Sequence, residues 1–291
     1  MTAAASYSAC PIKRARRSKS EMEAIKASIY AVVSVDHPMT VRQTFYRLVS
    51  AGVIDKSEAE YQGTVIRLLT DMRRSGEIPW GWITDYTRYR RKPRSFANIE
   101  DAMADTAEFY RRALWSDLDT HVECWLEKEA LSGVLFHETS KYDVPLMVTK
   151  GYPSLSFLHA AGEEIAGIGK RTFVYYFGDH DPSGVDIPRK VEAGLREFAP
   201  DIEIYFERVA VVPAQIIQYG LPTRPTKKSD SRSRSFDGES VEVDAIPPAE
   251  LRNLCRDRIE QHLSDDLMQT HIAAEESERQ LLHAWAGGDT A

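Results

Sequence analysis

Apolar residues recur at helical spacing through the first part of the chain. Ser20 stands three residues before Glu23, which is a capping-box pattern, and an apolar periodic stretch runs from Met22 to Val33. These features predict a first helix. A second helix is predicted over 40–51, because its apolar residues fall on one helical face. They are Val41, Phe45, Leu48 and Val49.

A third helix and a turn-rich segment complete this region. Residues 57–75 show helical periodicity, with Val65, Leu68, Leu69 and Met72 on one face. Residues 78–84 are aromatic and interrupted by Gly and Pro, which favours a small β-hairpin. Three short helices and a hairpin, or wing, indicate a winged-helix domain over 20–96, a variant of the helix-turn-helix. The small, polar and basic residues 1–19 are expected to form a disordered arm.

The rest of the chain alternates between strand-like and helix-like patterns. A linker helix is expected within 97–118. Four β-like runs then alternate with helical stretches, at 121–126, 145–148, 172–177 and 202–206. This alternation predicts an α/β domain over 119–291, with a Rossmann-like, mainly parallel sheet covered by helices. The polar, low-complexity residues 222–240 are expected to be a mobile loop, followed by a helical C-terminal extension.

Charge is distributed unevenly between these two regions. Residues 1–115 hold 19 Lys and Arg against 13 Asp and Glu, so they carry +6. The remaining residues hold 18 against 31 and carry −13, which brings the whole chain to −7. A basic first region joined to an acidic second one is typical of a DNA-binding module attached to another domain. Chance patterning of solvated surfaces is the alternative.

Other features bear on the cellular compartment. No apolar run approaches the roughly 18 residues that a membrane span needs, and no apolar core follows the basic N-terminal stretch. We therefore expect neither a membrane partner nor a secretory signal. Cys10, Cys124 and Cys255 are far apart in the sequence, and their spacing fits no zinc motif. A reducing, cytoplasmic location without a structural disulfide is expected.

Acidic residues follow two of the predicted strands. Asp179 and Asp181 come directly after 172–177, and Pro182 opens the next helix. Glu127 comes directly after 121–126. If the two strands are neighbours, the three carboxylates converge at one edge of the sheet, where α/β folds carry their sites. An all-oxygen cluster of this kind suits Mg²⁺. An isolated Asp-x-Asp is more often ordinary turn chemistry.

This combination resembles the Toprim domain of topoisomerases, primases and related nucleases. It is most similar to the A subunit of type IIB topoisomerases (topoisomerase VI) and to the related meiotic double-strand-break transesterase, and closest to compact stand-alone homologues called Mini-A. The matching motifs are Glu127-Lys128, the turn Gly151-Tyr152-Pro153 and the loop from Asp179 to Gly184. The resemblance spans roughly 40–220. It implies that Glu127, Asp179 and Asp181 bind magnesium.

The resemblance also implies a nucleophile in the preceding winged helix. The family pattern is Arg, two residues, an aromatic residue and Tyr, and Arg42 to Tyr46 matches it. Arg42 and Tyr46 are four residues apart and share a helical face, so the guanidinium can stabilise phenolate or phosphate charge. The implied activity is Mg²⁺-dependent DNA cleavage through a 5′-phosphotyrosyl intermediate, as in the A subunit of an ATP-hydrolysing type II topoisomerase.

The resemblance implies partners as well. Double-stranded DNA is the implied substrate, and each tyrosine of a homodimer would face the partner's metal site. The chain shows no Gly-rich nucleotide loop, so strand passage would need a separate ATPase (B-type) subunit. Association with the nucleoid follows from DNA binding. Two other readings stay open: a hydrolytic Toprim nuclease in which Tyr46 is structural, and a catalytically inert winged-helix DNA-binding protein.

Basic residues near the predicted wing are candidates for contacts to DNA phosphates. They are Arg67, Arg73, Arg74, Arg88, Arg90, Arg91 and Lys92. The last four surround a tyrosine just beyond the wing, an arrangement that suits backbone contacts. The alternative for Arg67, Arg73 and Arg74 is a solvated helix face, and for the other four it is a solvated linker.

Overall fold

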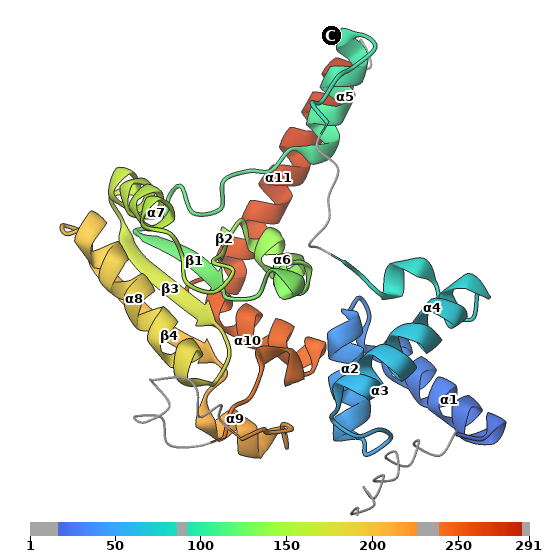
Figure 1. Ribbon diagram of the computed structural model, residues 1–291. Coiled ribbons are helices and arrows are strands. Elements are labelled where there is room, and N and C mark those ends of the chain that lie inside the picture. The colour runs from blue at the N-terminus through green and yellow to red at the C-terminus, as the bar shows by residue number, and fades with distance from the viewer. Residues whose placement is uncertain (1–16, 86–91, 226–238, 287–291) are drawn as a thin grey trace, which may run out of the picture.

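The computed structural model describes residues 17–85, 92–225 and 239–286, and it has an α/β fold (Figure 1). A module of N-terminal helices stands beside a helix-covered sheet, and a two-helix arm projects from the sheet. The predicted arm 1–19 and mobile loop 222–240 lie largely outside the described residues, as do Arg88, Arg90 and Arg91.

The N-terminal module begins with α1 (Lys19–Asp36) and α2 (Val41–Ser50). A continuous helical stretch follows: α3 (Glu58–Glu60), a π-helical segment (Tyr61–Ile66) and α4 (Arg67–Arg74). The predicted start of α1 is wrong by two residues, because Ser18 and Glu21 form its capping box. Ser20 and Glu23 repeat the same spacing one half-turn later, so the pattern alone does not distinguish them.

The predicted hairpin over 78–84 is wrong. Trp80–Trp82 form a short 3₁₀ helix, and Ile83 makes a single parallel bridge with Met39. This arrangement buries Ile78 and Ile83 in the core without a partner strand. Trp82 stacks on His37 with ring centroids 4.7 Å apart. The three-helix arrangement is present, but the described residues contain no β-wing.

The described residues form one parallel sheet of four strands in the order β2-β1-β3-β4. The strands are β1 (Thr120–Leu126), β2 (Leu146–Val148), β3 (Arg171–Phe177) and β4 (Ile204–Ala210). Three predicted helices connect or follow them: α6 (Ser132–Thr139), α7 (Leu155–Ile168) and α8 (Pro182–Phe198). The predicted mainly parallel, helix-covered sheet is confirmed.

Alternation along the strands directs side chains to two separate cores. Trp125 and Tyr176 pack with α7 and α8 on one face. Cys124 and Tyr175 belong to the other core, which α6 and α10 (Pro248–Glu260) cover and which continues into the N-terminal helices. The short helix α9 (Pro213–Gln218) follows β4. The acidic strand ends therefore lie near the junction between the sheet and the N-terminal module.

The arm pairs α5 (Ile99–Phe109) with α11 (Asp265–Ala286) (Figure 1). The linker helix predicted within 97–118 is thus present, but it ends at Phe109. Tyr110 leaves it in an extended conformation, and its hydroxyl donates to Glu278 of α11 at 2.7 Å. Within the described residues, no helix combines the length and the apolarity that crossing a bilayer requires.

Candidate functional site

The parallel pairing of β1 and β3 brings two predicted acids together. Leu126 is in register with Phe177, so Glu127 and Gly178 follow side by side. The Glu127 amide donates to the Phe177 carbonyl at 2.9 Å, and the Asp179 amide donates to Glu127 Oε2 at 3.1 Å. The two acids therefore occupy adjacent strand ends.

Both carboxyl groups are protonated more readily than usual. Burial, followed by the charge of Asp179, raises the pKa of Glu127 to about 7. Burial raises the pKa of Asp179 to about 6, although Lys128 acts in the opposite direction. Two desolvated carboxylates at adjacent strand ends make a site that a cation stabilises.

Glycines allow the close approach at this loop. A Cβ on Gly178 would lie 2.5 Å from Glu127 Oε2, and a Cβ on Gly184 would lie 2.0 Å from the Asp179 carbonyl oxygen. Arg208 of β4 donates to that same carbonyl and to the Gly184 carbonyl. The loop can therefore fold back on Glu127 only because these two positions lack side chains.

Asp181 has a different position from the other two acids. It is the N-cap of α8, and its Oδ1 accepts from the Gly184 amide at 2.7 Å. Its charge also raises the pKa of Glu127. As the side chains stand, no three acidic, His or Cys groups among the described residues are arranged to hold a metal ion.

The donor set nevertheless fits magnesium. Glu127, Asp179 and Asp181 supply hard oxygen ligands, which Mg²⁺ prefers, and it commonly binds through one or two carboxylates plus waters. The ammonium group of Lys128 supplies the compensating charge in the structure, with its Nζ 3.1 Å from Asp179 Oδ1. One of the acids that would hold Mg²⁺, Asp179, is thus in contact with a cation from the chain itself.

Lys128 links the acid cluster to two further acids. Its Nζ donates to Asp244 Oδ2 at 2.6 Å and to Glu242 Oε2 at 3.0 Å. Burial alone would lower the pKa of Lys128, but Asp244, Asp179 and Glu242 outweigh it and raise that pKa. Lys128 therefore stays charged inside the protein.

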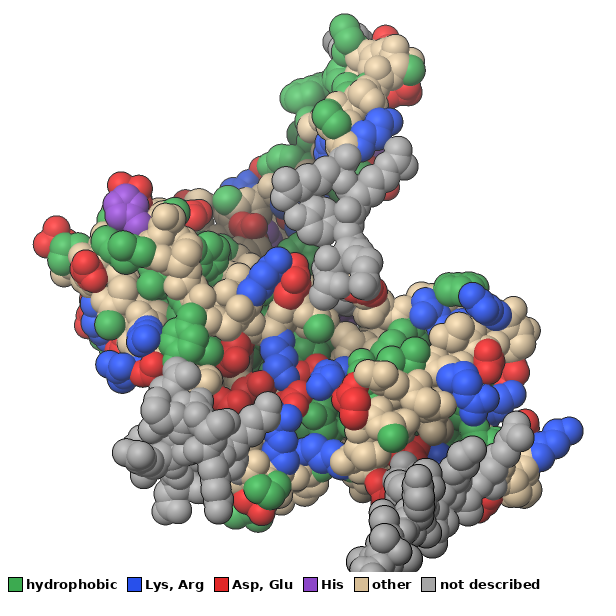
Figure 2. Space-filling view, viewed as in Figure 1, with side chains coloured by type: hydrophobic (Ala, Val, Ile, Leu, Met, Phe, Trp, Pro, Cys, Tyr) green, Lys and Arg blue, Asp and Glu red, His purple; other side chains and the backbone are tan. Residues whose placement is uncertain are grey.

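Glu242 extends this network to the N-terminal module. Its Oε2 also accepts from Arg42 Nε at 3.3 Å, and its Oε1 lies 2.9 Å from Arg224 Nη1. Burial alone would raise the pKa of Glu242, yet Lys128, Arg42 and Arg224 lower it to about 2. Figure 2 shows acidic and basic side chains interleaved across the junction between the N-terminal helices and the sheet.

Tyr46 lies in a pocket on the N-terminal side of this network. The pocket has a volume of about 200 Å³, and its wall beside Tyr46 includes three basic side chains, Arg42, Lys56 and Arg224, and two acidic ones, Glu58 and Glu242. Tyr46 is only 3% exposed, and the Lys56 ammonium lies 5.3 Å from the centre of its ring. Burial, followed by the charge of Glu242, raises the pKa of the phenol well above its ordinary value.

The sequence interpretation missed the residues that join Tyr46 to the acid cluster: Lys56, Arg224, Glu242 and Asp244. Glu242 and Asp244 do repeat the two-residue spacing of Asp179 and Asp181. No strand pattern directly before them marked them as strand-terminal acids. Their position depends on a long-range backbone bridge between His180 and Val241.

The predicted DNA-contacting residues have varied surroundings. Arg67 and Arg74 are exposed on α4, and Lys92 is exposed beyond it. The Arg73 guanidinium lies 4.5 Å from the centre of the Trp80 ring, and Trp80 is 62% exposed. Lys and Arg side chains gather around α4 in Figure 2. The remaining candidates Arg88, Arg90 and Arg91 fall outside the described residues.

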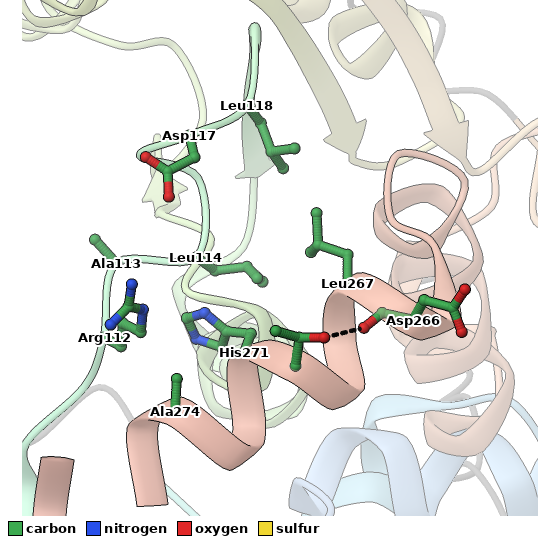
Figure 3. Close-up of a pocket in the computed structure, with 10 residues that line it drawn as sticks. Arg112, Ala113, Leu114, Asp117, Leu118, Asp266, Leu267, His271 and Ala274 are labelled. Carbon is green, nitrogen blue, oxygen red and sulfur yellow. Dashed lines mark hydrogen bonds between the residues drawn. The ribbon is translucent and has the colours of Figure 1, made fainter. Parts of the chain in front are cut away.

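A second cavity lies where α11 meets the segment before β1 (Figure 3). It has a volume of about 400 Å³, and apolar residues such as Leu114, Leu118 and Leu267 form much of its wall. His271 also lines it, and its Nε2 lies 3.8 Å from Glu275 Oε2. This cavity shares no residue with the acid cluster or the Tyr46 pocket, so it is not the candidate site.

Comparison with models of known protein families finds none that matches this chain. Comparison with curated proteins likewise finds no match. The candidate site is therefore defined by its geometry: a tyrosine in a cationic pocket, joined by Glu242 and Lys128 to a pair of acids at neighbouring strand ends.

Proposed function

We propose that the chain is a Mg²⁺-dependent DNA-cleaving transesterase in which Tyr46 is the nucleophile. One observation carries the proposal: Tyr46 shares its pocket with Arg42, Lys56 and Arg224. Three cationic side chains around one phenol suit a phosphodiester, whose non-bridging oxygens carry the negative charge that such groups bind.

The proposed step transfers one phosphoryl group from a 3′-oxygen of DNA to Tyr46. The Tyr46 oxygen attacks a DNA phosphorus and forms a phosphotyrosyl bond, while the bond from phosphorus to the 3′-oxygen breaks. The phenol proton is transferred to the released 3′-oxygen, so one end of the cut strand carries a 5′-phosphotyrosyl group and the other end of the same strand carries a free 3′-hydroxyl. Arg42, Lys56 and Arg224 stabilise the charge on the phosphate oxygens during attack.

The acid cluster has a separate part in the proposal. Glu127, Asp179 and Asp181 would hold Mg²⁺, which supplies positive charge to the reacting phosphate when it is bound. Glu127 and Asp179 must both be ionised to do this, and their raised pKa values make the site sensitive to pH. In the wider proposal the substrate is double-stranded DNA, the enzyme is a homodimer, and an ATPase partner would be needed for topoisomerase activity.

The burial of Tyr46 favours one alternative. The residue is 3% exposed and the pKa of its phenol is raised, which makes it a poor nucleophile until the pocket opens. In a hydrolytic nuclease, water would attack instead and Tyr46 would serve only to pack the N-terminal module. The two reactions differ in whether the protein becomes covalently attached to DNA.

The test uses supercoiled plasmid and Mg²⁺, with the reaction stopped by detergent and half of each sample then treated with protease. Variants Tyr46→Phe and Asp179→Ala are compared with Tyr205→Phe, which alters an exposed tyrosine on β4. We expect protein-linked DNA ends with the unaltered protein and with Tyr205→Phe, and none with Tyr46→Phe or Asp179→Ala. Free ends that persist with Tyr46→Phe but vanish with Asp179→Ala would replace the proposal with hydrolysis.

A further inference from the structure

Glu242 touches both halves of the site, the Tyr46 pocket and the acid cluster. Its side chain is 7% exposed, and its two oxygens contact three cations from separate parts of the chain: Arg42, Lys128 and Arg224. Arg42 and Arg224 line the Tyr46 pocket, whereas Lys128 contacts Asp179.

The backbone around Glu242 is attached to the Asp-x-Asp loop itself. The His180 amide donates to the Val241 carbonyl at 2.8 Å, and the Val241 amide donates back at 2.9 Å. The Val243 amide donates to Asp179 Oδ1 at 2.8 Å. These bonds on either side of Glu242 hold its backbone against the loop from Asp179 to Asp181. The orientation of the Glu242 side chain toward Arg42 and Lys128 therefore depends on that loop.

We propose that Glu242 is a positioning residue, which directs Arg42 toward the Tyr46 pocket and holds Lys128 against Asp179. This inference rests on the proposed transesterase function and adds a residue to it. Glu242 acts through the two cations and does not itself touch the reacting phosphate.

The charges predict an unusual combination of effects. Glu242 is a carboxylate beside an anion pocket, so it repels a phosphate that approaches Arg42 and Arg224. Removing its charge should therefore strengthen the binding of a simple anion. The same change releases Arg42 and Lys128 from their fixed positions, so transfer should slow. A carboxylate that only stabilises the fold has no reason to produce these opposite effects.

The experiment compares Glu242→Gln and Glu242→Asp with the control Glu207→Gln. Glu207 is also paired with an arginine, Arg258, at 2.9 Å, but it lies on β4 and lines neither half of the site. Calorimetric titration with inorganic phosphate, without Mg²⁺ or DNA, measures the affinity of the Tyr46 pocket for an anion. Formation of the protein–DNA adduct measures transfer, and thermal unfolding checks the fold.

With Glu242→Gln we expect phosphate to bind several-fold tighter, and adduct formation to fall by roughly 100-fold, the usual effect of losing one oriented charge-stabilising group. Glu242→Asp retains the charge, so it should keep phosphate affinity near that of the unaltered protein and recover part of the transfer rate. Glu207→Gln should change neither quantity.

Two results would overturn the role of Glu242: unchanged phosphate affinity in a folded Glu242→Gln variant, or equal adduct formation by Glu242→Gln and Glu207→Gln. If Glu242→Gln is unfolded, the decision falls to Glu242→Asp, which overturns the role if its transfer rate equals that of Glu207→Gln. If the unaltered protein forms no adduct but phosphate affinity still responds as expected, the transesterase proposal fails and the charge relationship of Glu242 to the pocket stands.

Discussion

Arg42 and Lys128 share one carboxylate oxygen. Glu242 Oε2 lies 3.3 Å from Arg42 Nε and 3.0 Å from Lys128 Nζ. Arg42 belongs to helix α2 of the N-terminal module, and Lys128 follows strand β1. The proposed nucleophile pocket and acid cluster of a single chain are therefore in electrostatic contact.

Arg42 should matter for transfer more than for DNA affinity. Arg42→Gln removes a cation from the Tyr46 pocket, so we expect adduct formation to slow by roughly 100-fold while DNA affinity changes little. Arg47→Gln is the matched control, because Arg47 lies on the same helix and pairs with Asp36 at 3.0 Å. Rates of adduct formation on a labelled duplex decide the matter. Equal losses in the two variants would contradict the assigned role.

Glu127 should make the metal-free protein less stable as pH rises. Its pKa is about 7 in the folded protein against an ordinary 4.5, so between these values the folded state holds a proton that the unfolded chain has lost. The stabilisation that protonated Glu127 contributes is therefore fully present below the unfolded pKa of 4.5, and it is lost as pH rises through the folded pKa of about 7. Glu127→Gln should escape this loss.

Urea unfolding in EDTA measures the effect. The unfolding free energy of Glu127→Gln minus that of the unaltered protein should grow between about pH 4.5 and about pH 7, by on the order of 1–3 kcal/mol. A difference that stays constant across this range would show that Glu127 does not titrate there.

Magnesium should stabilise the protein more at higher pH. Glu127 and Asp179 must lose their protons to bind a cation, so the rise in melting temperature caused by Mg²⁺ should be larger above about pH 7 than near pH 5. Asp179→Asn should remove most of this rise. Asp201→Asn, at an exposed aspartate before β4, should retain it. A shift that survives in Asp179→Asn would place the ion elsewhere.

Gly178 should tolerate no side chain. A Cβ there would lie 2.6 Å from the ring of the buried Tyr176 as well as 2.5 Å from Glu127 Oε2, so Gly178→Ala should cost about 1–3 kcal/mol in unfolding free energy and weaken Mg²⁺ binding. Gly167 in α7 has nothing within 4 Å of the added carbon. Gly167→Ala should instead stabilise by about 0.5–1 kcal/mol, the gain in helix propensity. Chemical unfolding of both variants tests the contrast, which fails if the two behave alike.

Arg67 and Arg74 should contribute to DNA affinity through phosphate contacts. Each change to Ala should weaken binding similarly for all sequences and reduce the slope of log affinity against log salt by about 1. Arg171→Ala is the control, because Arg171 is an exposed arginine at the start of β3. Fluorescence anisotropy over a salt series gives the slopes. An unchanged slope would assign α4 to a solvated face.

Local patterns predicted the elements whose signals lie within a few residues. Strand β3 ends in an apolar run from Phe173 to Phe177 and β1 ends in Cys124, Trp125 and Leu126, and the parallel pairing of the two strands brings Glu127 beside Asp179. The prediction of a hairpin over 78–84 was wrong because turn residues indicate a reversal of chain direction but do not supply a partner strand. Ile83 pairs with Met39 instead.

The middle of the site could not be predicted in the same way. Glu242 reaches Arg42 across 200 positions of sequence and Lys128 across 114. Hydrophobic periodicity carries no information about such pairs, because a charged residue in a short irregular segment looks the same whether it faces water or a partly buried lysine. Only the backbone bridge at Val241 distinguishes the two cases.

The pairing of α5 with α11 bears on how the two modules find each other. Helix α5 precedes β1 in the chain, and α11 follows the sheet and holds α5 through contacts such as Tyr110 to Glu278. The covalent tether between the modules therefore runs only from the N-terminal helices to α5, and not all the way to β1. A shorter tether raises the effective concentration of one module at the other. Truncation before α11 would lengthen the tether and so lower the local concentration of the N-terminal module at the sheet, without changing a residue of either.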